Sequence, residues 1–280
     1  MTEFDGLPVL RDPVAIAAFE GWNDAADAAS AAVDHLDVVW DARRIASLDP
    51  EEYYDFQVTR PILTHDSAGN RHLEWPTTRF LVASPPGANR DVVLIRGIEP
   101  SMRWRSYCGE ILEVCHALEV DRIVLLGALL ADVPYTRPLP VSGHAADPAV
   151  QERLRLVRSR YEGPVGIVGV LHDAGQRADV DMLSFWVHVP HYAGTPPCPK
   201  ATLALLHRVE EALDLPVPVA DLAEESAAWE ARVRSAVEQD EELAEYVREL
   251  ERRAGEPGLR EATGDELASE FERYLRRRRE

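Results

Sequence analysis

The chain has 280 residues, a hydrophobic content of 46% and a formal net charge of −19. This length is typical of one large or two modest globular domains, and it allows a sizeable core without metals or disulfides. The negative charge argues against nucleic acids and anionic membranes as partners, because binding to them depends on clustered Lys and Arg.

The cysteine content and the start of the chain indicate a reducing environment. Cys108, Cys115 and Cys198 have neither metal-binding spacing nor an even-numbered disulfide framework. The first residues are acidic and lack an export signal. The longest apolar run, residues 123–131, is too short to cross a bilayer. We therefore expect a cytoplasmic protein with no metal or other cofactor and no membrane partner.

The first part of the chain predicts a strand, a helix and then a β-rich stretch. An apolar run at residues 14–19 is typical of a buried strand. Gly21 ends it, and Asn23 is expected to cap an Ala-rich helix at residues 25–36. The β-rich stretch is interpreted as antiparallel strands or hairpins set into the sheet. Its segments are residues 38–40, 43–48, 56–60, 72–75 and 79–83.

The middle of the chain alternates between predicted strands and predicted helices. The strands are expected at residues 91–95, 122–126, 165–171 and 184–189. The helices are expected at residues 104–118, 172–181 and 199–213, with a short one starting at Asp147-Pro148. This alternation predicts an α/β fold whose sheet is largely parallel and covered by helices on both faces.

The C-terminal part reads as a charged helical region, residues 219–280, that follows a core domain at residues 1–218. Between residues 222 and 250, nine positions advance by fours and threes, and seven of them are apolar. This coiled-coil-like seam packs either on its own domain or on another subunit. After Pro257-Gly258, a capping box at residues 263–266 predicts a last helix. The arginines at 276–279 are interpreted as cations that complement the dipole of that helix, not as a nucleic-acid site.

The candidate functional residues follow the ends of predicted strands, where open α/β sheets bind their ligands. They are Trp22, Asn23, Asp24, Glu99, Arg103, Tyr135, Thr136, Arg137 and His191. If the strands before Trp22 and before Asp132 are neighbours, their loops form one crevice, in which facing carboxylates act as acid and base. The alternative is structural, with carboxylates and arginines pairing to brace their own loops.

Common catalytic motifs are missing from the sequence. It contains no Walker loop, no G-x-G-x-x-G, no G-x-S-x-G and no H-E-x-x-H. His188 and His191 form the only close histidine pair, and in a strand residues three apart point to opposite faces. We therefore assign no catalytic residue and no metal ligand.

Several segments together resemble the proteasome assembly chaperone 2 family in its bacterial form. They are residues 19–25 (FEGWNDA), 49–56 (DPEEYYDF), 59–61 (TRP), 97–100 (GIEP), 126–128 (LGA), 133–138 (VPYTRP), 161–164 (YEGP) and 189–192 (VPHY). The resemblance implies a three-layer α/β/α, phosphorylase/hydrolase-like fold with a C-terminal helical extension. It also implies a homo-oligomer, with a trimer favoured, and proteasomal or other protein subunits as partners.

Two positions depart from the pattern of that family. Its usual histidine in the segment Pro-His-Thr-Arg-Pro is Tyr135 here. Relatives that dock on proteasomes can end in a hydrophobic residue, Tyr and any residue, whereas this chain ends in four arginines and Glu280.

Two functions follow from these patterns. The first is a non-enzymatic, proteasome-assembly-chaperone-like protein that acts as an oligomeric scaffold or interaction protein. The second is an enzyme or binding protein for a nucleoside-like or amino-acid-like molecule that uses the strand-end crevice. A cavity surrounded by Trp22, Asp24, Glu99 and Arg137 would favour the second function, and an Arg137 paired within the protein would favour the first.

Overall fold

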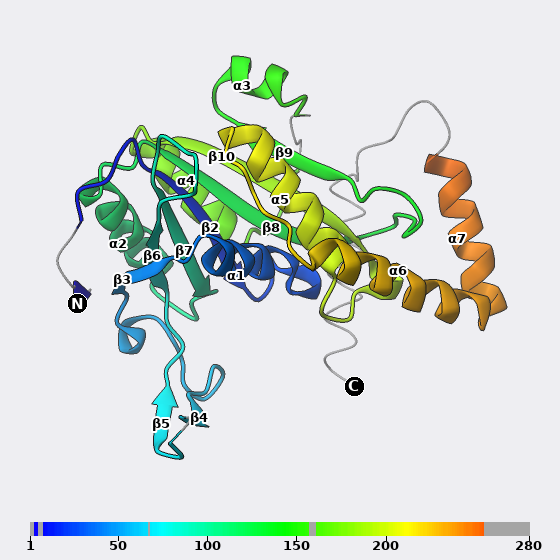
Figure 1. Cartoon of the computed structure of the whole chain (residues 1–280), viewed down its shortest axis with the longest axis horizontal. Helices are drawn as coiled ribbons and strands as arrows, with labels where there is room; N and C mark the ends of the chain where they lie inside the picture. Colours follow the sequence, from blue (N-terminus) through cyan, green and yellow to red (C-terminus); the bar gives the residue numbers. More distant parts are fainter. Residues whose placement is uncertain (1–2, 5–7, 67, 157–160, 255–280) are drawn as a thin grey trace.

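The computed structural model describes residues 3–4, 8–66, 68–156 and 161–254. Its main sheet has eight strands in the order β1-β3-β6-β7-β2-β8-β10-β9 (Figure 1). Five of them, β3, β7, β2, β8 and β10, run in one direction, and β1, β6 and β9 run in the other. The strands are β1 Glu3–Phe4, β2 Val14–Glu20, β3 Arg43–Ser47, β6 Arg79–Ala83, β7 Val92–Ile98, β8 Arg122–Ala131, β9 Val141–Ala145 and β10 Asp181–Pro190.

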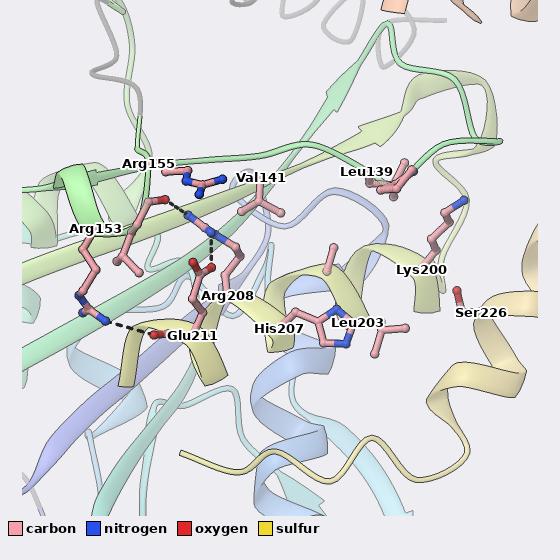
Figure 2. A pocket seen from close by; sticks show the side chains of 13 residues that line it. Leu139, Val141, Arg153, Arg155, Lys200, Leu203, His207, Arg208, Glu211 and Ser226 are labelled. Carbon is pink, nitrogen blue, oxygen red and sulfur yellow. Dashed lines mark hydrogen bonds and ion pairs between the residues drawn. The ribbon is translucent and has the colours of Figure 1, made fainter. Parts of the chain in front are cut away.

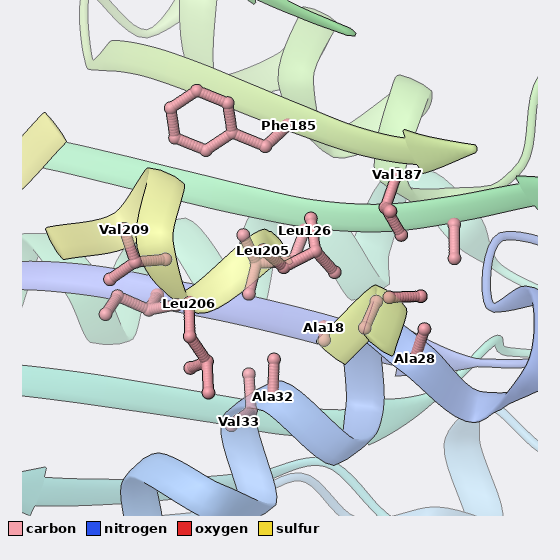
Figure 3. Packing of buried hydrophobic residues seen from close by; sticks show 14 of the residues in the cluster. Ala18, Ala28, Ala32, Val33, Leu126, Phe185, Val187, Leu205, Leu206 and Val209 are labelled. Carbon is pink, nitrogen blue, oxygen red and sulfur yellow. The ribbon is translucent and has the colours of Figure 1, made fainter. Parts of the chain in front are cut away.

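Helices cover both faces of the sheet, as the α/β alternation predicted. One face carries α1 (Ala28–Val39) and α5 (Pro199–Leu213), and the other carries α2 (Trp104–Ala117) and α4 (Ile167–Arg177). Alternate residues of the central strands face the two layers. In β8, for example, Leu126 packs with the α1 and α5 layer, which Figure 3 shows. Its neighbour Leu125 packs with the other layer.

A separate two-stranded hairpin stands away from the main sheet (Figure 1). It consists of β4 (Ile62–His65) and β5 (Arg71–Glu74), and the chain reaches it after β3 and a short turn, η2 (Pro50–Glu52). Because β3 is parallel to β7, the chain leaves the sheet at the carboxyl edge of the parallel strands. It returns to the same edge at Arg79, the register partner of Ser47.

Several predicted elements are confirmed and others are wrong. The strand at 79–83 and the helix at 199–213 have the predicted bounds. Residues 38–40 end helix α1 instead of forming a strand, and residues 56–60 form a turn. The predicted strand at 165–171 is the start of α4, which ends at Arg177. Its buried residues Ile167, Val168 and Leu171 have the spacing of a helix face.

The C-terminal seam packs on its own chain. It is divided between α6 (Leu222–Glu238) and α7 (Glu241–Ala254). The break has a clear cause, because the Asp240 carboxylate accepts a hydrogen bond from the Leu243 N–H and so caps α7. The core cluster on the α5 side includes Leu222, Trp229 and Val247. Leu250 of α7 is also buried.

Two shorter elements complete the description, α3 (Pro148–Arg153) and η3 (His191–Ala193), and η1 (Ala25–Asp27) precedes α1. The predicted last helix and the terminal arginines lie outside the described residues. Among the described helices, none is both long enough and apolar enough to cross a membrane.

Candidate functional site

Glu99 joins three loops at the carboxyl edge of the sheet. It directly follows β7, and its Oε1 accepts one hydrogen bond from Asn23 Nδ2 at 2.9 Å and another from the Ile167 N–H at 2.8 Å. Ile167 is the first residue of α4. A carboxylate at this position satisfies a free N–H of the first helical turn and complements the helix dipole. Glu99 therefore fastens α4 and the loop after β2 to the end of β7.

Gly166 allows this junction to close. A Cβ atom at this position would lie 2.1 Å from Asn23 Nδ2. Any side chain here would displace Asn23, whose own side chain is buried against the α4 start. The glycine is thus required by close packing at the junction.

The buried side chain of Asp24 caps helix α1. Its Oδ1 accepts hydrogen bonds from the Ala29 N–H at 2.7 Å and from the Ser30 N–H at 3.2 Å. Burial raises the pKa of Asp24 to about 6, and these hydrogen bonds to the carboxylate oppose the rise. The sequence assigned the cap to Asn23, and this was wrong by one residue.

Two residues of the loop after β8, Thr136 and Arg137, bind helix α7. Arg137 donates hydrogen bonds from its guanidinium to the carbonyls of Glu251 and Ala254, at 3.2 and 3.1 Å. These carbonyls belong to the last turn of α7, where a cation is stabilised by the helix dipole. Thr136 Oγ1 donates to Glu251 Oε1 at 2.5 Å. We call this contact between Thr136, Arg137 and α7 the helix clamp.

Tyr135 is buried next to the helix clamp. Its N–H donates to Tyr192 Oη at 2.8 Å, and its carbonyl accepts from Lys200 Nζ at 2.5 Å. Lys200 also pairs with Glu230 of α6 at 2.8 Å. The single lysine of the chain therefore ties the loop to α5 and α6, and Tyr135 serves this packing with its backbone and its ring.

His191 also contacts α7. Its Nδ1 lies 3.1 Å from Asp132 Oδ1, and Tyr246 Oη of α7 donates to the same oxygen at 2.8 Å. The rings of His191, Tyr192 and Tyr246 pack edge to face, with centroids 5.5 to 6.0 Å apart. Thr136, Arg137 and His191 thus contact α7, and Tyr135 lies beside them in the chain and against Tyr192.

Arg103 lies apart from both groups. It precedes α2 and forms an ion pair with Glu52.

A buried network of hydroxyl groups was not predicted from the sequence. In it, Tyr54 Oη donates to the Ile98 carbonyl at 2.9 Å, and Thr78 Oγ1 forms a hydrogen bond with Tyr107 Oη. No motif signals this network, because its members are far apart in the chain.

The expected crevice does not bring all its residues together. Strands β2 and β8 are neighbours, as the crevice requires. The first loop nevertheless binds Glu99 and α1, and the second binds α7. None of the nine candidates lines either of the two best-formed cavities in the described part of the chain.

The larger cavity, of about 720 Å³, lies between α5 and the segment from α3 (Figure 2). Three of its cations, Arg153, Lys200 and Arg208, are bound to protein groups. Arg208 donates to the Leu154 carbonyl at 2.7 Å and pairs with Glu211, and Arg153 donates to the carbonyls of Glu211 and Ala212. These bonds hold α3 and the residues after it against α5. Among the described residues, no group of His, Cys, Asp and Glu has an arrangement that could hold a metal ion.

Comparisons with known proteins give a consistent result. The model of the PAC2 family matches residues 18–237. A PAC2 family protein from Streptomyces avermitilis is 52% identical, with a TM-score of 0.79 over 84% of this chain and 100% of that chain. A proteasome-assembly chaperone homologue from Mycobacterium tuberculosis is also 52% identical, with a TM-score of 0.77 over 84% and 99% of the two chains.

A more distant likeness extends to archaea. The proteasome activator PbaB of Pyrococcus furiosus is 18% identical, with a TM-score of 0.68 over 84% of this chain and 98% of that chain, so the two share a fold. Among curated protein sequences, none matches the chain.

Proposed function

The chain belongs to the PAC2 family, and from this premise we propose that it is a non-enzymatic, chaperone-like protein that works as an oligomeric scaffold for other protein subunits. A solved relative with 52% identity is a proteasome-assembly chaperone homologue, which supports a role in protein assembly. Proteasomal subunits are accordingly the first partners to test.

The observation that carries the proposal is how the polar strand-end residues are used. Glu99 and Asp24 bind the N–H groups at the starts of α4 and α1, and Arg137 binds the carbonyls at the end of α7. An enzyme keeps such groups facing a cavity, where they reach a substrate. Here they hold helices in place, which supports a rigid scaffold.

The same contacts weigh against the small-molecule function. That function needed Arg137 and Glu99 around one cavity, and the two side chains bind different helices. A thermal-shift screen with nucleosides, phosphate and amino acids tests it, because a ligand that binds the folded state raises the unfolding midpoint. We expect no rise, and a reproducible rise with one class would favour the small-molecule function.

Co-purification at native expression level tests the scaffold. The tag belongs at the N-terminus, so that the chain end stays free, and captured proteins are identified by mass spectrometry against an untagged strain. We expect recovery of untagged copies of this chain together with at least one other protein subunit. Recovery of this chain alone, under cross-linking as well, would contradict the chaperone-like role.

A second strain sharpens this experiment. It expresses the chain ended at Ala254, which keeps all described helices and strands, including the α7 carbonyls bound by Arg137. If the full chain and the shortened chain capture equal amounts of the partner protein, the partner binds to residues that the shortened chain retains. Loss of the partner with retention of the oligomer would assign the contact to residues 255–280.

A further inference from the structure

Exposed apolar side chains gather at one edge of the molecule. Ten large apolar side chains are exposed in the described residues, and two of them, Val9 and Val38, lie elsewhere. The remaining eight lie on the hairpin or on loops at the carboxyl edge of the parallel strands. They are Trp22, Val58, Ile62, Leu63, Leu73, Trp75, Met102 and Val165. Clustered exposure of this kind marks a protein interface.

The hairpin and its flanks, residues 58–66 and 68–76, form a projecting arm (Figure 1). Leu63 and Leu73 are register partners and share one face of the hairpin, whereas Ile62 points to the other face. All three are exposed, with Ile62 at 63% and Leu73 at 52%. Neither face of the arm is therefore covered by the body of the molecule.

The root of the arm is well fixed although its strands are uncovered. Trp75 packs edge to face on Phe56, with ring centroids 4.9 Å apart. Thr77 Oγ1 donates to the Leu48 carbonyl at 2.6 Å, and the Leu48 N–H donates to the Thr78 carbonyl at 3.0 Å. The arm is thus held at a defined place on the sheet edge.

Trp22, Met102 and Val165, which we call the edge patch, lie on loops that meet beside this root. Trp22 precedes Asn23, and Val165 precedes the α4 start, and both of these segments are bound to Glu99. The Met102 N–H donates to the Tyr53 carbonyl at 3.2 Å, so its loop adjoins the segment that leads to the arm. The edge patch and the arm are therefore neighbouring apolar surfaces.

The stability of the arm indicates what covers it. A two-stranded hairpin without other packing is at best marginally stable in water. A surface that packs on the arm has to be present whenever the chain folds. A second copy of the same chain is always present at that time. An arm of one copy that packs on the edge patch of the next is a head-to-tail contact, which generates a ring when its rotation closes and an open filament when it does not.

Charge also favours a second copy. The chain carries a net charge of −19, so two copies repel each other over most of their surfaces. Within the arm, Arg60 and Arg71 balance Asp66 and Glu74. The arm is thus a segment without net charge, with exposed apolar side chains, on an acidic protein, and two copies approach through it with little repulsion.

We propose that the arm of one copy packs on the edge patch of a second copy and that this contact assembles the oligomer. The inference rests on the proposed function, which requires an oligomer, and it adds the surface that forms it. It assigns a role to the β4 and β5 strands, which pack on none of the helices described above.

Mass measurement of the full chain tests this contact. Light scattering and sedimentation are compared for the wild type, an arm variant (I62E with L73E), an edge variant (M102E with V165E) and V38E. Val38 is 79% exposed on α1 and provides a matched apolar-to-charged control. We expect both double variants to fall to the monomer mass of 31.2 kDa and V38E to keep the wild-type mass. Circular dichroism checks that all four chains are folded.

The outcomes separate the two proposals. A monomeric wild type would contradict the oligomeric scaffold itself. An oligomeric wild type whose arm or edge variant stays oligomeric would overturn the arm contact, and the proposed oligomeric scaffold would not be contradicted.

Photo-cross-linking is a second experiment, in which a photo-reactive residue in place of Leu73 identifies the protein that contacts the arm in cells. An adduct at the mass of two copies supports the contact, and an adduct with a different protein overturns it.

Discussion

The buried carboxyl of Asp24 provides a quantitative test of the loop after β2. Its side chain is 4% exposed, and burial raises its pKa from 3.8 to about 6. At 1.36 kcal/mol per pKa unit, the ionised side chain costs about 3 kcal/mol of stability at neutral pH. Because the folded pKa is raised, the contribution to stability is complete below pH 3.8 and is lost as the pH rises through about 6.

The substitution Asp24→Asn removes the charge and keeps an oxygen that accepts from the Ala29 N–H. Its absolute effect includes the altered hydrogen bond to Ser30, but that part does not depend on pH. Relative to the wild type, the variant is therefore expected to gain about 2 kcal/mol in free energy of unfolding between pH 4.5 and pH 8. Urea unfolding of both chains at constant ionic strength measures this difference.

A matched control separates burial from capping. Asp147 caps α3 at an exposed position, where its Oδ1 accepts from the Ala149 N–H at 2.8 Å. Asp147→Asn changes a cap without relieving a buried charge, so we expect no comparable gain with pH. Parallel stability curves for Asp24→Asn and the wild type, or a gain that shrinks towards pH 8, would refute the argument.

Two further predictions concern packing and the helix clamp. Gly166→Ala should destabilise the chain by about 2 kcal/mol because its Cβ would lie 2.1 Å from Asn23 Nδ2; Gly109→Ala in α2, where no atom lies within 4 Å of a Cβ, should instead stabilise by about 0.5–1 kcal/mol. Equal effects of the two in urea unfolding would contradict the junction. Arg137→Ala should speed hydrogen exchange in residues 241–254 while lowering global stability by about 1 kcal/mol or less, since the contact is exposed. Unchanged exchange there, relative to Arg248→Ala on the same helix, would mean that the clamp does not hold α7.

The elements that the sequence predicted best are those with one dominant local signal. Residues 79–83 and 199–213 have a clear strand pattern and a clear helix pattern, and their bounds agree with the structure. Residues 165–171 have an apolar run that suits either element, and periodicity alone does not separate the two in so short a segment. In the structure, residues 167–171 belong to helix α4. Glu99, at the end of β7, accepts a hydrogen bond from the first N–H of this helix.

The positions of the candidate residues in the fold were predicted more readily than their contacts. Composition and position placed Asp24, Glu99 and Arg137 at strand ends, which is where they lie. Their partners come from distant parts of the chain: Glu99 binds Ile167, and Arg137 binds residues at the end of α7. Such long-range pairings depend on the packing of whole helices, which local patterns do not contain.

Ser47 of β3 and Arg79 of β6 are direct register partners, although the arm lies between them in the chain. The main chain departs from the sheet and rejoins it at neighbouring positions on the same edge, so the excursion between them contributes no strand to the eight. The two hairpin strands contribute no buried side chain to the core, whereas Tyr53 and Tyr54, in the segment that leads to them, are buried in it. Substitutions on the hairpin strands are therefore expected to change what the molecule associates with, while the α/β body still folds.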